Sequence, residues 1–106
     1  MLVPMLGALA FLFQYTPSKP PEVPTTGDYL AVCDDDAKAC SDILFDHTWR
    51  FSVGAQTVGY CLPQEGDDTL AITYRVVAWL KAHPETHGQP TDPSLNKALM
   101  ASYPCR

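Results

Sequence analysis

Four cysteines are the residues of this chain whose chemistry is most informative. They stand at Cys33, Cys40, Cys61 and Cys105, and no two of them form a C-x-x-C pair, so their spacing does not predict a four-cysteine zinc site. An even number of cysteines in a short chain with an apolar start instead predicts two disulfides in an oxidising compartment. Three pairings are possible, and the elements that carry the cysteines must decide between them.

Three histidines are the next candidates for chemistry. His83 and His87 have the spacing of two metal ligands on one helical face, but Pro84 breaks the helix that such a site needs. His47 stands beside Asp46, yet a solitary histidine on an apolar stripe is more often a packed, hydrogen-bonded core residue. We therefore expect structural or surface roles for the histidines and no bound metal.

The acidic run of Asp34, Asp35 and Asp36 has the composition of a calcium loop but not its pattern. An EF-hand needs ligands at alternate positions, a central glycine and a distant bidentate glutamate, and these are missing. No pair of acids, Cys-His couple or phosphate-binding loop is positioned for catalysis either. We therefore predict no catalytic residue and no cofactor, and a protein that is not an enzyme.

The charge of the chain argues against nucleic acid as a partner. The formal net charge is −5, whereas binding to nucleic acid needs clustered lysine and arginine. Between residues 28 and 68, nine acidic residues stand against only two basic ones, Lys38 and Arg50. A surface of this kind steers a basic partner toward the protein, although it also simply keeps a small protein soluble.

Composition divides the 106 residues into three parts. Residues 1–14 are an apolar, signal-like segment that is too short to span a bilayer. Residues 15–26 are a proline-rich linker, in which fixed φ angles favour extended backbone. Residues 27–106 are the folded domain. We expect the first segment to act as a signal that directs the chain to a membrane, so that the domain lies in an oxidising compartment, and an uncleaved segment would anchor it there.

Hydrophobic periodicity predicts an all-α domain of four helices. Caps and prolines place the helix ends: a short helix from Thr25-Thr26 into Cys33, a second from Ala37 to about Phe51, a third from Asp67 or Asp68 to His83-Pro84, and a fourth from Asp92-Pro93 to just before Pro104. The acidic run should form a solvated turn after the first helix. The third helix carries apolar residues on two faces, which predicts that it is central.

The predicted helices bring the cysteines together in two pairs. Cys33 and Cys40 flank one tight turn between the first two helices. Cys61 and Cys105 stand just outside the two ends of a C-terminal helical hairpin, so they become neighbours if its helices pack antiparallel. We therefore predict the disulfides Cys33–Cys40 and Cys61–Cys105, which would staple a domain too small to depend on its core alone.

The C-terminal half also resembles a known family. The resemblance rests on Leu62-Pro63 after Cys61, the helix from Leu70 to Leu80, His83-Pro84-Glu85 followed by His87, Ala98-Leu99, and the ending Tyr103-Pro104-Cys105. In this order they resemble the Rap/Tai family, periplasmic immunity proteins that protect bacteria from type VI secretion amidase effectors. The helix after Cys40 departs from the family pattern, because Asp46 stands where a small residue is expected.

The resemblance implies a disulfide-stapled helical domain that often forms homodimers. Immunity members of the family block a peptidoglycan-cleaving cysteine amidase by occluding its active-site cleft. We therefore predict a periplasmic immunity protein whose partner is a peptidoglycan amidase toxin. Two alternatives stay open: a periplasmic domain of the same fold with an unknown envelope role, and a small chaperone that acts under acid stress.

Two exposed stretches are the expected contacts with a protein partner. One is the acidic turn of Asp34, Asp35 and Asp36. The other is the glycine-bearing loop before Cys61, where we select Gly54, Gln56 and Thr57. Loops on a rigid, stapled frame are the usual place for binding residues.

Overall fold

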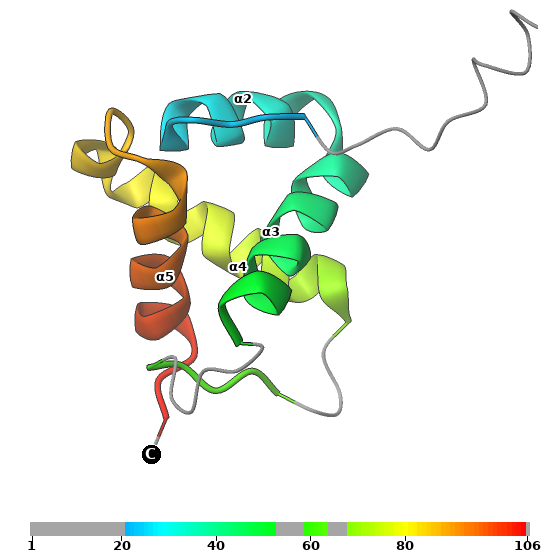
Figure 1. The fold of residues 1–106 in the computed structure, drawn as a ribbon, viewed down its shortest axis with the longest axis vertical. Coiled ribbons are helices and arrows are strands. Elements are labelled where there is room, and N and C mark those ends of the chain that lie inside the picture. The colour runs from blue at the N-terminus through cyan, green and yellow to red at the C-terminus, as the bar shows by residue number, and fades with distance from the viewer. Residues whose placement is uncertain (1–20, 53–58, 64–67, 106) are drawn as a thin grey trace, which may run out of the picture.

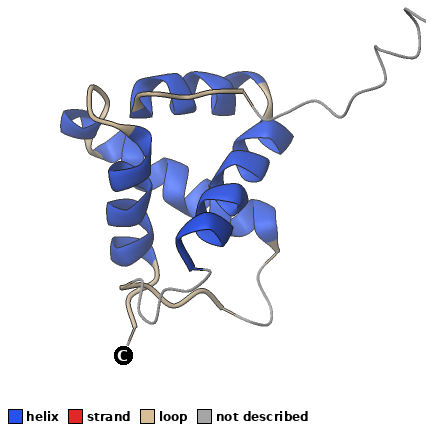
Figure 2. Ribbon diagram, viewed as in Figure 1, coloured by secondary structure: helices blue, strands red, loops and turns tan. Residues whose placement is uncertain are grey.

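The chain folds into helices that are short and closely packed. A computed structural model describes residues 21–52, 59–63 and 68–105. The elements are α2 (Thr26–Asp35), α3 (Ala37–Ser52), α4 (Thr69–Ala82), the 3₁₀ turn η1 (Pro84–Thr86) and α5 (Thr91–Ser102) (Figures 1 and 2). Within the described ranges there is no β-strand, only an isolated bridge between Thr25 and Pro90. The predicted all-α fold of four helices is therefore confirmed.

Helices α2 and α3 follow each other with a single residue between them. A capping box starts α2, because the Thr25 hydroxyl accepts from the Asp28 amide and the Asp28 carboxylate accepts from the Thr25 amide. The Asp36 carboxylate accepts from the amides of Lys38 and Ala39 at 3.0 and 3.1 Å. Because Asp36 starts α3 in this way, α2 runs on through Asp34 and Asp35. The predicted turn of three aspartates is therefore reduced to Asp36.

Both predicted disulfides are present. Cys33 and Cys40 are joined with their Cα atoms 4.6 Å apart, and Cys61 and Cys105 with theirs 5.0 Å apart. The second bridge lies where the chain enters and leaves the α4–α5 hairpin, and the Cys61 amide donates to the Tyr103 carbonyl at 2.8 Å beside it. The hairpin is therefore closed by a covalent bond and by a backbone hydrogen bond.

Helix α4 is central, as predicted, because it contacts α2, α3 and α5, but only one of its two apolar faces is buried. Ile72, Val76 and Leu80 are buried against the other helices. On the opposite side, Leu70 is 40% exposed and Tyr74 is 61% exposed. The helices that it contacts leave this opposite face uncovered. A domain this small has too few elements to cover a helix all round.

The start of α5 also differs from the prediction. The helix begins at Thr91 rather than after an Asp92 cap, and its N-cap position is Pro90. The Thr91 hydroxyl instead donates to the Val23 carbonyl. This leaves the Asp92 carboxylate available for a contact with α3.

The segment before α2 runs antiparallel to the segment before α5. The Thr26 amide donates to the Gln89 carbonyl at 3.0 Å, and the Gly27 amide donates to the His87 carbonyl at 2.9 Å. The Thr91 amide donates back to the Pro24 carbonyl at 3.3 Å. Residues 23–27 are therefore held against residues 87–91, far along the chain.

The structural roles expected for His83 and His87 are confirmed. His83 Nδ1 lies 2.7 Å from the Trp79 carbonyl, and its ring stacks on the Trp79 ring at 3.7 Å. His87 Nε2 lies 2.8 Å from the Leu80 carbonyl. Both rings therefore bind carbonyls in the last turn of α4: His83 binds that of Trp79, and His87 binds that of Leu80, which also accepts from the His83 amide at 3.1 Å. Among the described residues, no helix has the length and apolar character needed to cross a membrane.

Burial of tyrosine hydroxyls links stability to alkaline pH. The Tyr29 side chain is fully buried, and its hydroxyl donates to the Cys40 carbonyl at 3.1 Å. Burial raises the pKa of Tyr29 and, in the same direction, the pKa of Tyr60. In the unfolded chain both hydroxyls ionise near their ordinary pKa of about 10. Their contribution to stability is therefore complete below about pH 10 and is lost as the pH rises toward the folded-state pKa.

We expect the free energy of unfolding to fall above about pH 10, by at most about 1.4 kcal/mol per pH unit for each such tyrosine. Urea unfolding at several pH values from neutral to about pH 11 measures this. Tyr29→Phe should lose about 1 kcal/mol at neutral pH with its hydrogen bond, and should depend less steeply on alkaline pH. An unchanged pH dependence in Tyr29→Phe would contradict the assignment.

Candidate protein-binding site

The described residues offer no site for metal or thiol chemistry. Within residues 21–52, 59–63 and 68–105, no group of three or more histidine, cysteine or acidic side chains could hold a metal ion. All four cysteines are in disulfides, so none supplies a thiolate. What the described surface does present is charge and several hollows, two of which combine charged and apolar side chains.

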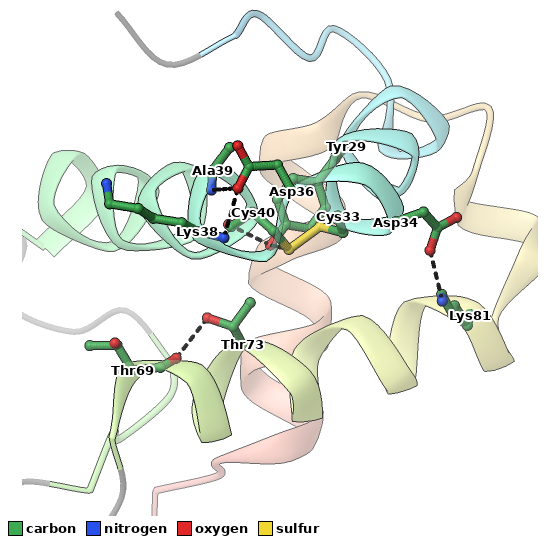
Figure 3. The surroundings of a disulfide bond; sticks show 10 residues. All are labelled: Tyr29, Cys33, Asp34, Asp36, Lys38, Ala39, Cys40, Thr69, Thr73 and Lys81. Carbon is green, nitrogen blue, oxygen red and sulfur yellow. Dashed lines mark hydrogen bonds and ion pairs between the residues drawn. A yellow bond between two sulfur atoms is a disulfide. The ribbon is translucent and has the colours of Figure 1, made fainter. Parts of the chain in front are cut away.

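The acidic run of residues 34–36, which forms the end of α2 and the turn into α3 and is called the acidic turn below, lies beside the first disulfide, and its Asp34 reaches Lys81 of α4 (Figure 3). Asp34, Asp35 and Asp36 are all exposed. Asp34 is tied to α4 by an ion pair with Lys81 at 3.1 Å, while Asp36 caps α3. Asp35 is the member of the run whose side chain has no hydrogen bond or ion pair to another described residue, so it is the best placed of the three to meet a partner.

A hollow of about 110 Å³ opens next to this turn. The Cys33–Cys40 bridge lies on one side of it, and the exposed face of α4, with Tyr74 and Val77, lies on the other. Its rim carries the Asp34–Lys81 ion pair. The predicted contact residue Asp34 thus belongs to a surface that combines charge with a small apolar depression.

The second predicted contact, at Gly54, Gln56 and Thr57, lies outside the described residues. The described residue that follows it is Gly59, which has φ of +83°. A Cβ atom at Gly59 would stand 2.8 Å from Met100 Sδ. Glycine is favoured here because a side chain would strain the backbone at this φ and would displace the Met100 side chain of α5.

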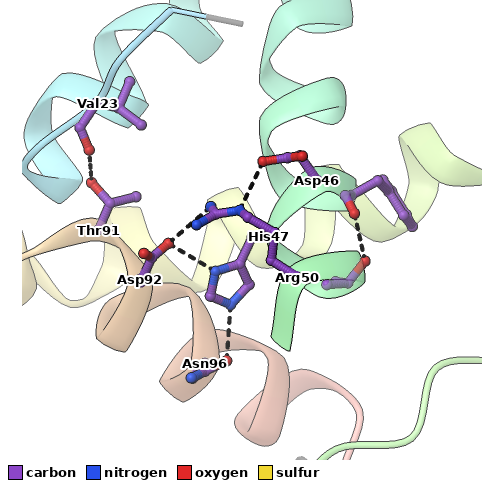
Figure 4. A network of polar contacts seen from close by, with 9 residues as sticks. Val23, Asp46, His47, Arg50, Thr91, Asp92 and Asn96 are labelled. Carbon is purple, nitrogen blue, oxygen red and sulfur yellow. Dashed lines mark hydrogen bonds and ion pairs between the residues drawn. The ribbon is translucent and has the colours of Figure 1, made fainter. Parts of the chain in front are cut away.

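His47 is the buried centre of a polar network between α3 and α5 (Figure 4). Its side chain is 0% exposed, as expected of a packed core histidine. Nδ1 lies 2.9 Å from Asp92 Oδ1, and Nε2 lies 2.9 Å from Asn96 Oδ1. Both ring nitrogens are therefore used to hold α5 against α3, and neither is left for a substrate.

Arg50 extends this network to the surface. Its Nε donates to Asp46 Oδ2 at 2.9 Å, and its Nη2 lies 3.5 Å from Asp92 Oδ1. Figure 4 shows the guanidinium between the two carboxylates. Sequence reasoning missed Arg50, Asp92 and Asn96 as members of one site. The four-residue spacing of Asp46 and Arg50 was the only visible signal.

A cleft of about 500 Å³ opens beside the network, and we call it the Asp92 cleft. Residues 21–24, the Ile43 to Arg50 part of α3, and residues 90–93 line it. Four prolines, Val23 and Ile43 supply apolar walls, and Glu22, Asp46, Arg50 and Asp92 supply charge. Such a mixed cleft suits recognition of a side chain that has both an apolar and a charged part.

Together, the fold and these surfaces define a small disulfide-bonded helical protein built for binding. Residues 25–105 match the sequence model of the family described as Rap1a immunity proteins, and the chain belongs to this family. The predicted resemblance to the Rap/Tai family is thus confirmed, and the match extends well beyond the C-terminal half. No curated protein and no solved structure matches the chain significantly. Membership indicates an immunity protein that binds a secreted effector and inhibits it without being an enzyme.

Proposed function

We propose that the protein is a periplasmic immunity protein that binds a peptidoglycan amidase delivered by type VI secretion and inhibits it by occluding its active site. The observation that carries this proposal is the match of residues 25–105 to the immunity family. The two disulfides support the choice of compartment, because the bacterial periplasm allows disulfides to form and persist.

Three further parts of the proposal concern location and assembly. The apolar residues 1–14 direct the chain to the inner membrane or contact it. The folded domain forms a homodimer. The acidic turn around Asp35, together with the loop that contains Gly54, Gln56 and Thr57, contacts the amidase.

The direct test uses the peptidoglycan amidase effectors encoded in the genome that carries this protein, each purified and assayed separately. The purified immunity protein is added to each amidase and to peptidoglycan, and the release of cleaved fragments is measured. We expect the activity of one amidase to fall to the background level at about one equivalent of the immunity protein. Full activity of every amidase in the presence of a large excess would overturn the proposal.

Reversing the charge of the acidic turn should slow binding of the amidase. Asp35→Lys is expected to lower the association rate constant about tenfold at low salt, since charges at an interface mainly affect encounter. Lysine in the last turn of α2 suits the helix dipole, so the fold should be preserved. Surface plasmon resonance at two salt concentrations measures the effect.

Glu85→Lys is the matched control for this charge reversal. Glu85 is exposed in η1, which lies near the start of α2, at the far end of that helix from Asp35 (Figure 1). Equal slowing by the two variants would mean that only net charge matters and would contradict a contact at the acidic turn.

A further inference from the structure

The Asp92 cleft has a chemistry that the acidic turn does not share. Its walls are apolar over three segments of the chain, with Val23 and Ile43 among them. Its charged residues are Glu22, Asp46 and Asp92 against Arg50, so acidic groups exceed basic ones by two. An apolar channel with an excess of carboxylates is complementary to a long side chain that ends in a cation.

Asp46 and Asp92, the two carboxylates of the network, each use only one of their two oxygens within it. Asp46 uses Oδ2 for Arg50, and Asp92 uses Oδ1 for both His47 and Arg50. Within the described part of the chain, Oδ1 of Asp46 and Oδ2 of Asp92 receive no hydrogen bond. The side chains are 52% and 41% exposed, so a partner can reach them.

These carboxylates are also held in position before any partner arrives. Asp92 is fixed by the buried His47 at 2.9 Å, and Asp46 is fixed through Arg50 at 2.9 Å. The wall formed by Val23 is fixed in the same way, because its carbonyl accepts from the Thr91 hydroxyl. A preorganised site of this kind loses little conformational entropy when it binds.

We infer that the Asp92 cleft binds an arginine or lysine side chain from an exposed segment of the effector protein. The methylene groups of that side chain lie along the apolar walls, and its cationic end binds Asp46 and Asp92. That the partner is a protein rests on the proposed function, whereas its cationic side chain is inferred from the charges and walls of the cleft. The cleft is therefore a second contact, separate from the acidic turn.

Peptide binding tests the chemistry without the effector. The probe is an acetylated, amidated pentapeptide with arginine between two leucines, and the control is the same peptide with citrulline, which keeps the shape and removes the charge. Both are titrated to millimolar concentration into the isotope-labelled full chain, and NMR follows the amides of Asp46, Arg50 and Asp92. We expect saturable shifts with the arginine peptide, and about tenfold weaker binding with citrulline. Equal affinities, no shifts at the cleft, or shifts only at the acidic turn would overturn the inference.

Two matched variants test whether the carboxylates are responsible. Asp46→Asn removes a charge inside the cleft, where Asp46 pairs with Arg50 four residues away at 2.9 Å. Asp42→Asn removes a charge outside the cleft, where Asp42 pairs with Lys38, also four residues away and at 2.9 Å. We expect Asp46→Asn to weaken binding of the arginine peptide by a factor of about three or more, and Asp42→Asn to leave it unchanged. Equal effects of both variants would contradict the inference.

The effector separates failure of this inference from failure of the proposed function. If the amidase is inhibited by the wild-type protein and equally by Asp46→Lys, the cleft is not a contact and the proposed function stands. If the wild-type protein does not inhibit the amidase, the proposed function fails, and the peptide titration still decides the chemistry of the cleft.

Discussion

Replacing Cys61 and Cys105 together with serine is expected to lower the free energy of unfolding by about 4 kcal/mol. This disulfide joins residues 44 apart in sequence, so its loss releases a long loop in the unfolded chain. The expected loss is a large part of the total stability of a small domain. Urea unfolding of the oxidised protein, followed by circular dichroism, measures it by linear extrapolation.

The double replacement of Cys33 and Cys40 with serine is the control for loop length. These residues are only seven apart, so the same entropic argument gives about 2.5 kcal/mol. The stricter expectation is the order of the two losses in free energy of unfolding: removing Cys61–Cys105 should cost more than removing Cys33–Cys40. A larger loss from the short loop than from the long one would mean that native packing, and not loop closure, determines the contribution of each disulfide.

Replacing His47 with alanine is expected to cost about 3 kcal/mol. The ring is fully buried, packs against Phe51 at 4.7 Å between centroids, and holds both Asp92 and Asn96. Alanine removes this packing and both hydrogen bonds between α3 and α5. Urea unfolding at neutral pH measures the change.

His83→Ala is the matched control for the loss of a histidine ring. This ring is only half-buried. It makes one hydrogen bond, to the carbonyl of Trp79 four residues earlier, and stacks on the Trp79 ring. We expect a loss of about 1 kcal/mol. Similar losses in the two variants would show that the network around His47 contributes no more than an ordinary half-buried ring.

The pairing of the cysteines could be predicted because local geometry determines it. Cys33 and Cys40 lie on either side of the Asp36 turn, and Cys61 and Cys105 lie at the two ends of one hairpin. In both cases a helix pattern and a turn are enough to bring the sulfur atoms together. The burial of His47 was predictable for the same reason, since it follows from the apolar stripe of one helix.

The partners of His47 could not be predicted in that way. Asp92 and Asn96 are 45 and 49 residues away in sequence, and no helical period relates α3 to α5. The Asp92 cleft needs, in addition, the segment of residues 21–24, which composition alone describes as linker. A site built from three distant segments becomes visible only when the helices are packed.

The exposed face of α4 shows a different limit. Leu70 and Tyr74 are apolar and correctly spaced for burial, yet both remain in contact with solvent. Periodicity reports how apolar a helix face is, but it does not report how many neighbours the fold can provide. A domain with so few helices has too few neighbouring elements to bury every apolar helix face.

The antiparallel contact between residues 23–27 and residues 87–91 makes the domain difficult to divide. Its hydrogen bonds close a loop that contains Cys61, while the Cys61–Cys105 bridge closes a second loop that contains residues 87–91. The α2–α3 pair cannot leave the α4–α5 hairpin without breaking this contact together with the packing of the helices, so we expect the helices to unfold as one cooperative unit instead of two halves that unfold in turn.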